Sequence, residues 1–147
     1  MIVLILVLTL FFNTGSMQAQ TGTAKVATTE AVTPANVLKW TKEVLPKMER
    51  LVPALVKLKA DPSEPVRSDA LKLLAQVNHL KEINTKGTKL KAAEARRYYD
   101  LIAAVVNSFY IECKSQNGNV CCVDCHNHGI LGIWCFANCF VARFPGD

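Results

Sequence analysis

The residues whose types and spacing could carry out chemistry lie near the C-terminus of this chain. Six cysteines occur between positions 113 and 139, together with Asp124, His126 and His128. Thiolate and imidazole ligands suit zinc, whereas paired thiols in an oxidising compartment form disulfides. Because the chain begins with a segment typical of secretion, we expect disulfides, with no metal and no cofactor. The candidate disulfide cysteines are Cys113, Cys121, Cys122, Cys125, Cys135 and Cys139.

The spacing of four of these cysteines indicates how they could pair. Cys121 and Cys125 are four residues apart, as are Cys135 and Cys139, so each pair lies on one face of a helix. Two short antiparallel helices, with glycines between them at the reversal, would join Cys121 to Cys139 and Cys125 to Cys135. Six cysteines allow about fifteen complete pairings, and the spacing favours this one without excluding the others.

The CxxxC-x9-CxxxC spacing between Cys121 and Cys139 resembles that of the α-hairpinin toxins and inhibitors. The remaining pair would then be Cys113 and Cys122. On a helix Cys122 is rotated by about 100° from its neighbour Cys121 and can face elsewhere. Asn117-Gly118 supplies a tight turn before it. Such a bridge would tie the cysteine-rich segment to the helix that precedes it.

No set of residues suitable for catalysis emerges from the sequence. The run from Cys121 to His126 is similar to the CCxxHDxC motif of secreted phospholipases A2. That family needs a histidine and an aspartate where this chain has Cys125 and His126, and no glycine-rich calcium loop precedes the motif. His79 and Ser108 belong to no nucleophile–base set. We therefore predict no catalytic residues and a protein that is not an enzyme.

Apolar residues recur at helical spacing in three segments between residue 35 and about residue 112. Pro46 and Pro53 predict breaks near Leu45 and Val52, which gives two helices or one kinked helix in the first segment. Ser63 is the expected N-cap of the second helix and Gly87 its C-cap, and the third helix should begin near Thr88 or Lys89. The predicted apolar stripes are Val37, Thr41, Val44, Met48, Leu51, Leu55 and Leu58; Val66, Ala70, Leu73, Leu74, Val77 and Leu80; and Leu90, Tyr98, Leu101, Ile102, Val105 and Phe109.

These segments predict an all-α fold, a small three-helix bundle with a C-terminal disulfide-rich cap resembling a helical hairpin. The expected organisation is a signal peptide at 1–19, a flexible Thr-rich arm at 20–34, the helical bundle at 35–112 and the cysteine-rich cap at 113–147. Composition agrees with a folded chain, since 50% of the 147 residues are hydrophobic and 20% are charged.

The first residues indicate secretion. Ten of the eleven residues from 2 to 12 are apolar and none is charged. This run is shorter than the ~20 residues that cross a bilayer and suits the apolar core of a signal peptide. Cleavage after Ala19 is the favoured site, with cleavage after Ser16 as the alternative. A buried N-terminal helix or an uncleaved anchor is the other interpretation. We expect a secreted, extracellular protein.

Two surfaces are candidates for binding a partner. The net charge is +5, and the most basic stretch contributes a candidate patch for anionic lipid, glycan or an acidic receptor. This patch consists of Lys86, Lys89, Lys91, Arg96 and Arg97. Its Arg96-Arg97 pair is also a possible processing site, the alternative being an intact helix. Twelve of the sixteen residues from 129 to 144 are apolar, and they either pack on the bundle or form an exposed patch. The candidate apolar patch is Ile133, Trp134, Phe136, Phe140 and Phe144.

Together these features predict a secreted, non-enzymatic extracellular effector, toxin-like or hormone-like. It would bind a protein target through its disulfide-stabilised C-terminal module. A membrane-active host-defence protein and a structural component of an extracellular matrix or secretion are the alternatives. Partners are then an extracellular protein or a membrane surface, and nucleic acid is not expected for a secreted chain.

Overall fold

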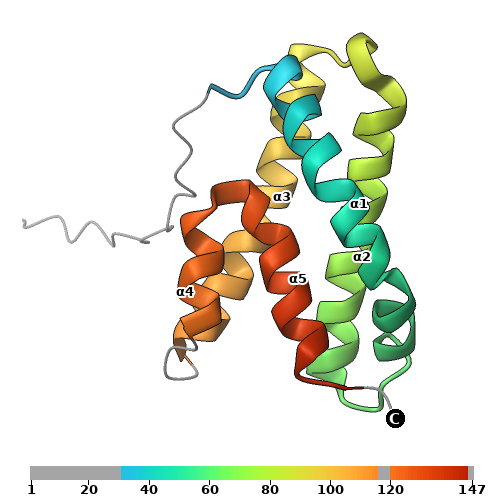
Figure 1. Cartoon of the computed structure of the whole chain (residues 1–147), viewed down its shortest axis with the longest axis vertical. Coiled ribbons are helices and arrows are strands. Elements are labelled where there is room, and N and C mark those ends of the chain that lie inside the picture. The colour runs from blue at the N-terminus through green and yellow to red at the C-terminus, as the bar shows by residue number, and fades with distance from the viewer. Residues whose placement is uncertain (1–30, 116–119, 146–147) are drawn as a thin grey trace, which may run out of the picture.

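The computed structural model describes residues 31–115 and 120–145, except for the side chains of residues 120–123. Within these ranges the protein is all-helical, as predicted, with no strand (Figure 1). The α-helices are α1 (Pro34–Leu58), α2 (Glu64–Lys86), α3 (Ala92–Ser115), α4 (Val120–Asn127) and α5 (Gly132–Ala142). Two 3₁₀ turns, η1 (Gly87–Lys89) and η2 (Gly129–Leu131), link α2 to α3 and α4 to α5. The predicted signal peptide and residues 20–30 of the predicted arm lie outside the described residues.

Helix α1 begins earlier than predicted and is not interrupted. The Thr33 hydroxyl accepts a hydrogen bond from the Asn36 backbone N–H at 3.2 Å, and Pro34, assigned above to the arm, is the first helical residue. Pro46 and Pro53 both lie inside this single helix, so of the two alternatives the one with two separate helices is wrong. Both prolines face solvent, while the opposite face of α1 is buried along its length. Burial of that face holds the helix together across the hydrogen bonds that proline removes.

The boundaries of α2 agree with the sequence, whereas α3 starts later. Ser63 is the N-cap of α2, and Gly87 is its C-cap with a φ of 52°, a conformation that favours glycine. The chain then makes the η1 turn before Ala92 begins α3, instead of continuing into a helix at residue 88 or 89. The Glu94 carboxylate accepts a hydrogen bond from the Lys91 backbone N–H at 3.1 Å, which fixes this later start.

The buried face of α3 differs from the predicted stripe. Leu101 is 40% exposed and Val105 is half-buried, although both were assigned to the core. The residues that α3 buries are Ala95, Tyr98, Tyr99, Ile102, Val106, Phe109 and Cys113. This helix contacts α1, α2, α4 and α5. Its buried positions therefore depend on where those neighbours lie, and a single stripe does not describe them.

The C-terminal helix belongs to the same core as the three long helices. In Figure 1, α5 runs beside α1 and α3, and the residues in contact confirm both neighbours. Four of its residues are buried in the continuous apolar cluster that begins at Val37, namely Ile133, Phe136, Ala137 and Phe140. Burial of these side chains removes the most apolar part of the C-terminal segment from water.

A disulfide and a close backbone contact join α4 to α5. Cys125 and Cys135 form a disulfide, with their Cα atoms 5.1 Å apart. A Cβ atom added to Gly132 would lie 2.0 Å from the Cys125 carbonyl oxygen. The first residue of α5 must therefore be a glycine for the backbone of α4 to pass this close.

Gly132→Ala is expected to destabilise the protein by about 1–3 kcal/mol or more, because the added methyl group meets a backbone atom that cannot move independently. Asn138→Ala, at an exposed position of the same helix, is the matched control and should change little. Urea unfolding followed by circular dichroism measures both. Equal stability of Gly132→Ala and the parent protein would contradict this close approach.

Replacing Cys125 and Cys135 together with alanine should cost about 3 kcal/mol of unfolding free energy, since the disulfide closes a short loop. The double variant avoids leaving a free thiol at either position. Thermal unfolding under non-reducing conditions provides the measurement. A loss below about 0.5 kcal/mol would mean that packing alone holds α5 in place.

Candidate functional site

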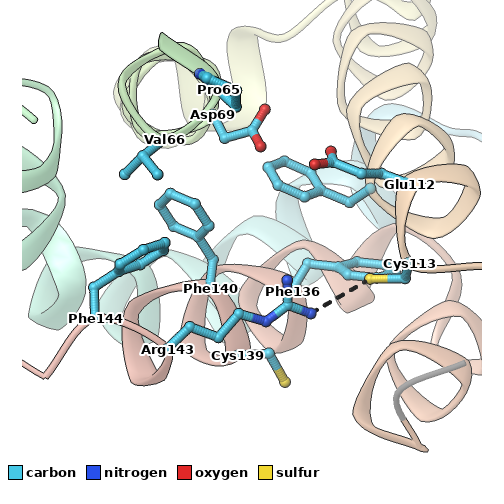
Figure 2. A pocket seen from close by; sticks show the side chains of 11 residues that line it. Pro65, Val66, Asp69, Glu112, Cys113, Phe136, Cys139, Phe140, Arg143 and Phe144 are labelled. Atoms are coloured by element: carbon cyan, nitrogen blue, oxygen red, sulfur yellow. Dashed lines mark hydrogen bonds between the residues drawn. The ribbon is translucent and has the colours of Figure 1, made fainter. Parts of the chain in front are cut away.

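A pocket of about 310 Å³ opens between the start of α2, the end of α3 and the second half of α5. Figure 2 shows side chains from all three helices pointing into it. Its size is at the lower end of the range for small-molecule sites, about 300–1,000 Å³, and is sufficient for one large side chain of a partner. The lining residues are Pro65, Val66, Asp69, Phe109, Glu112, Cys113, Phe136, Cys139, Phe140, Arg143 and Phe144.

Phenylalanine rings form the apolar part of this pocket. The ring centre of Phe109 lies 6.0 Å from that of Phe136 and 6.3 Å from that of Phe140. Phe140 in turn lies 5.4 Å from Phe144 in an edge-to-face arrangement. Because the first three rings are buried and Phe144 is half-buried, the rings lead from the core toward the surface. Such a series is rigid and can receive an apolar group at a small entropic cost.

Two carboxyl groups form the polar edge of the pocket. Asp69 of α2 is 6% exposed, and its carboxylate accepts a hydrogen bond from the Lys72 ammonium at 2.7 Å. Glu112 of α3 is half-buried, and in Figure 2 the two carboxyl groups turn toward each other. Two acids from different helices therefore share one partly desolvated corner.

This arrangement perturbs the ionisation of Glu112. Burial, and then the neighbouring Asp69 carboxylate, raise the pKa of Glu112 above its ordinary value. Lys72 and Arg143 lie near enough to oppose this rise, but the pKa remains raised. The negative charge at Glu112 is therefore only partly compensated by the cations around it.

Arg143 lies at the opposite side of the pocket, just after α5. Its guanidinium group donates to the Cys113 sulfur at 3.9 Å, a contact marked in Figure 2. Cys113 is disulfide-bonded and buried, so this contact brings the end of α5 against the end of α3. The result is a pocket with an apolar interior, two acids on one edge and a cation on the other.

Most residues of the predicted apolar patch are buried. Ile133, Phe136 and Phe140 are 0%, 2% and 7% exposed, so these three residues follow the alternative in which the segment packs on the bundle. They pack on α1 and α3 because burial there removes their side chains from water. Trp134 and Phe144 are half-buried, and the Lys47 ammonium lies 5.0 Å from the Trp134 ring centre. Phe136, Phe140 and Phe144 meet again as walls of the pocket.

Part of the predicted basic patch is neutralised within the protein. The Lys86 ammonium lies 2.7 Å from the Glu94 carboxylate, and this hydrogen bond raises the pKa of Lys86 and lowers that of Glu94. Arg96 pairs with Asp100 at 3.0 Å. Lys89 and Lys91 are exposed. Two of the five basic residues of the predicted patch are therefore paired with acids of the same protein.

The dibasic pair lies inside α3. The guanidinium group of Arg96 lies 5.7 Å from the Tyr99 ring centre, and that of Arg97 lies 5.1 Å from the Tyr98 ring centre. The Tyr98 hydroxyl donates to the Glu82 carboxylate at 2.6 Å, which fastens this part of α3 to α2. Cleavage between the two arginines would require the helix to open first.

The four cysteines whose side chains the structure describes are held as disulfides. The predicted Cys125–Cys135 bond is present, and Cys113 and Cys139 are also disulfide-bonded. The two predicted pairings through Cys121 and Cys122 fall on side chains outside the described residues. The Cys139 sulfur lies 4.0 Å from that of Cys125. Sulfur in a disulfide is not a thiolate, so this cluster offers no zinc ligands in its oxidised form.

The histidines near the cysteines have separate surroundings. His126 of α4 stacks on Tyr110 of α3 with ring centres 3.8 Å apart. Asp124 and His128 are exposed. Asp124 and His126 belong to α4, and His128 follows the end of that helix. His79 lies on α2, away from the cysteines. Its Nδ1 is 3.4 Å from the Gln76 side-chain oxygen, and its ring centre is 5.9 Å from that of Tyr98.

Sequence reasoning missed the acids of the pocket. Asp69 adjoins Ala70 in the apolar stripe of α2, and Glu112 adjoins Cys113 at the end of α3. The position of each acid beside the apolar face of a predicted helix was the one sign in the sequence that its carboxyl group could be partly buried. The sequence did not show that the two acids lie opposite each other, because they belong to different helices.

Comparison of the chain with family models, with curated proteins and with solved structures finds no match. Among the described residues, no helix is both long enough and apolar enough to cross a membrane. The function therefore has to be inferred from the geometry of the site.

Replacing Glu112 with glutamine should stabilise the protein relative to the parent as the pH rises. The folded state raises the pKa of Glu112, so its protonated form contributes stability below the unfolded pKa. That contribution is lost as the pH increases through the raised pKa. Urea unfolding at pH 4 and pH 7 measures the effect, and Glu43→Gln, an exposed change on α1, is the control. A difference between parent and Glu112→Gln that does not change with pH would contradict the shift.

Proposed function

We propose that this protein is a secreted, non-enzymatic extracellular effector that binds a protein target through its disulfide-stabilised C-terminal module. In this proposal the helices of residues 35–112 act as a three-helix bundle, and residues 113–147 act as a cap resembling a helical hairpin. A side chain of the target enters the pocket between α2, α3 and α5. Toxin-like and hormone-like ligands both act in this general way.

The pocket is the observation that carries this proposal. It combines a rigid aromatic interior with a few polar groups on its edge, which is the usual composition of a binding site. A partner side chain that is buried in such a pocket contributes far more to affinity than one on a flat surface. The side of the pocket that α5 forms belongs to the module to which the sequence assigned the binding function, and α2 and α3 of the bundle form the rest.

Secretion is supported by the apolar leader of residues 2–12 and by the disulfides of the C-terminal segment. Disulfides persist in extracellular compartments and are rare in the cytosol. Intact-mass measurement of the protein released by secreting cells tests this part. We expect a chain shortened by its leader and lighter than the reduced form by six hydrogen atoms, one for each cysteine. Retention of the leader in the released protein, or free thiols, would argue against it.

Binding through the pocket is tested with a random-peptide display library on the oxidised full-length protein. Val66→Trp places a large side chain at the mouth of the pocket, and Leu71→Trp places the same side chain on an exposed part of α2 outside it. We expect clones that bind the parent and Leu71→Trp but lose at least about tenfold in affinity for Val66→Trp, the equivalent of 1.4 kcal/mol. Circular dichroism and unfolding confirm that both variants are folded.

Failure to obtain any clone that depends on the pocket would overturn this proposal. Release of dye from anionic vesicles by micromolar oxidised protein would overturn it in favour of a membrane-active protein. Recovery of the native protein in an insoluble extracellular matrix would instead support a structural component.

A further inference from the structure

The acidic edge of the pocket lacks a full set of countercharges. Asp69 has Lys72 as its partner at 2.7 Å, on the same helix. The Glu112 carboxyl forms no ion pair among the described residues. It faces the carboxyl group of Asp69, which has the same charge when both are ionised. Lys72 and Arg143 lie near it but leave its ionised form disfavoured, as its raised pKa indicates. A cation brought into this corner would remove the remaining imbalance.

An anionic ligand fits the same corner poorly. A carboxylate or phosphate near Glu112 and Asp69 would add a third negative charge to a partly desolvated site. Arg143 could attract such a group, but its guanidinium already donates to the Cys113 sulfur, and the residue is exposed. The charge complementarity of the pocket therefore favours a cation beside the two acids.

The aromatic interior suits the rest of a basic side chain. The alkyl stem of lysine or arginine packs against apolar surface while its charged end reaches a polar group. The rings of Phe109, Phe136 and Phe140 supply that surface below the two carboxyl groups. Aromatic faces also attract a cation directly, and this attraction increases where water is excluded.

We propose that the pocket recognises a lysine or arginine side chain of the protein target, flanked by apolar residues, with its cation between Asp69 and Glu112 and its stem on the phenylalanine rings. This inference rests on the proposed function and names the chemistry that the pocket selects. The occupant is a basic side chain of a protein rather than a free small amine, because the proposed function is the binding of a protein target.

The test uses three short peptide probes that differ at one residue. They are the acetylated and amidated sequences Leu-Lys-Leu, Leu-norleucine-Leu and Leu-Glu-Leu. Each is titrated into isotopically labelled oxidised full-length protein, and the chemical shifts of the residues that line the pocket are followed by NMR. At pH 7 we expect the lysine probe to bind about tenfold more tightly than the norleucine probe, the difference typical of a hydrogen bond to a charged group. The glutamate probe should bind most weakly.

Variants assign this preference to the named acids. Glu112→Gln should remove most of the preference for lysine over norleucine. Val66→Trp should abolish the binding of all probes, and Leu71→Trp should leave it unchanged. Lowering the pH to 4 should reduce lysine binding alone, because Glu112 becomes protonated while the lysine keeps its charge.

The possible outcomes separate this inference from the proposed function. Equal binding of the lysine and norleucine probes in the pocket would overturn the selection for a cation and leave an apolar anchor in place. A persistent preference for lysine in Glu112→Gln would overturn the assignment to this acid corner. Shifts at the pocket from phenethylamine as strong as those from the lysine peptide would favour a free amine over a protein side chain. If no probe shifts the pocket at millimolar concentration, both proposals fail.

Discussion

The structure depends on burying helix α5, whose residues are too apolar to remain in water. Ile133, Phe136, Ala137 and Phe140 enter the same core as α1 and α3, so the C-terminal segment completes the buried cluster of the long helices. Two local features make this burial possible. The Cys125–Cys135 disulfide ties α5 to α4, and Gly132 lets the two backbones pass closely. A protein of this size has a small margin of stability, so a crosslink at the start of α5 has a large effect on whether that helix docks.

The pocket follows from the same docking. Because α5 reaches the beginning of α2 and the end of α3, its last phenylalanines meet Val66, Phe109 and the acids of those helices. The apolar walls come from residues that also contribute to the core, so the pocket is rigid. The acids come from the edges of buried helix faces, where water is scarce and charge is poorly screened. An apolar interior beside two neighbouring acids is the chemistry that a partner would encounter there.

The sequence predicted the helices well where one buried face dominates. For α1 the stripe from Val37 to Leu58 is buried apart from the half-buried Leu51, because that helix presents one side to the core. Ser63 and Gly87 fixed the ends of α2 through their backbone preferences. The prediction was poorer for α3, where Leu101 is exposed and Val106 is buried, since four other helices contact it. It also broke α1 at two prolines that the buried face of this helix tolerates.

The sequence alone predicted the all-helical class and the crosslinking of the C-terminal segment, and it favoured the Cys125–Cys135 pair among the possible pairings, because helical periodicity and cysteine spacing are local properties. The tertiary structure decided which side of α5 is hidden, that Asp69 and Glu112 face one pocket, and that Lys86 and Arg96 are paired with acids. Each of these depends on the distance between residues that are far apart in the chain or on different helix faces. Composition does not distinguish an apolar residue in the core from one on a pocket wall or at the surface. Only the packing of the helices assigns each residue to one of these places.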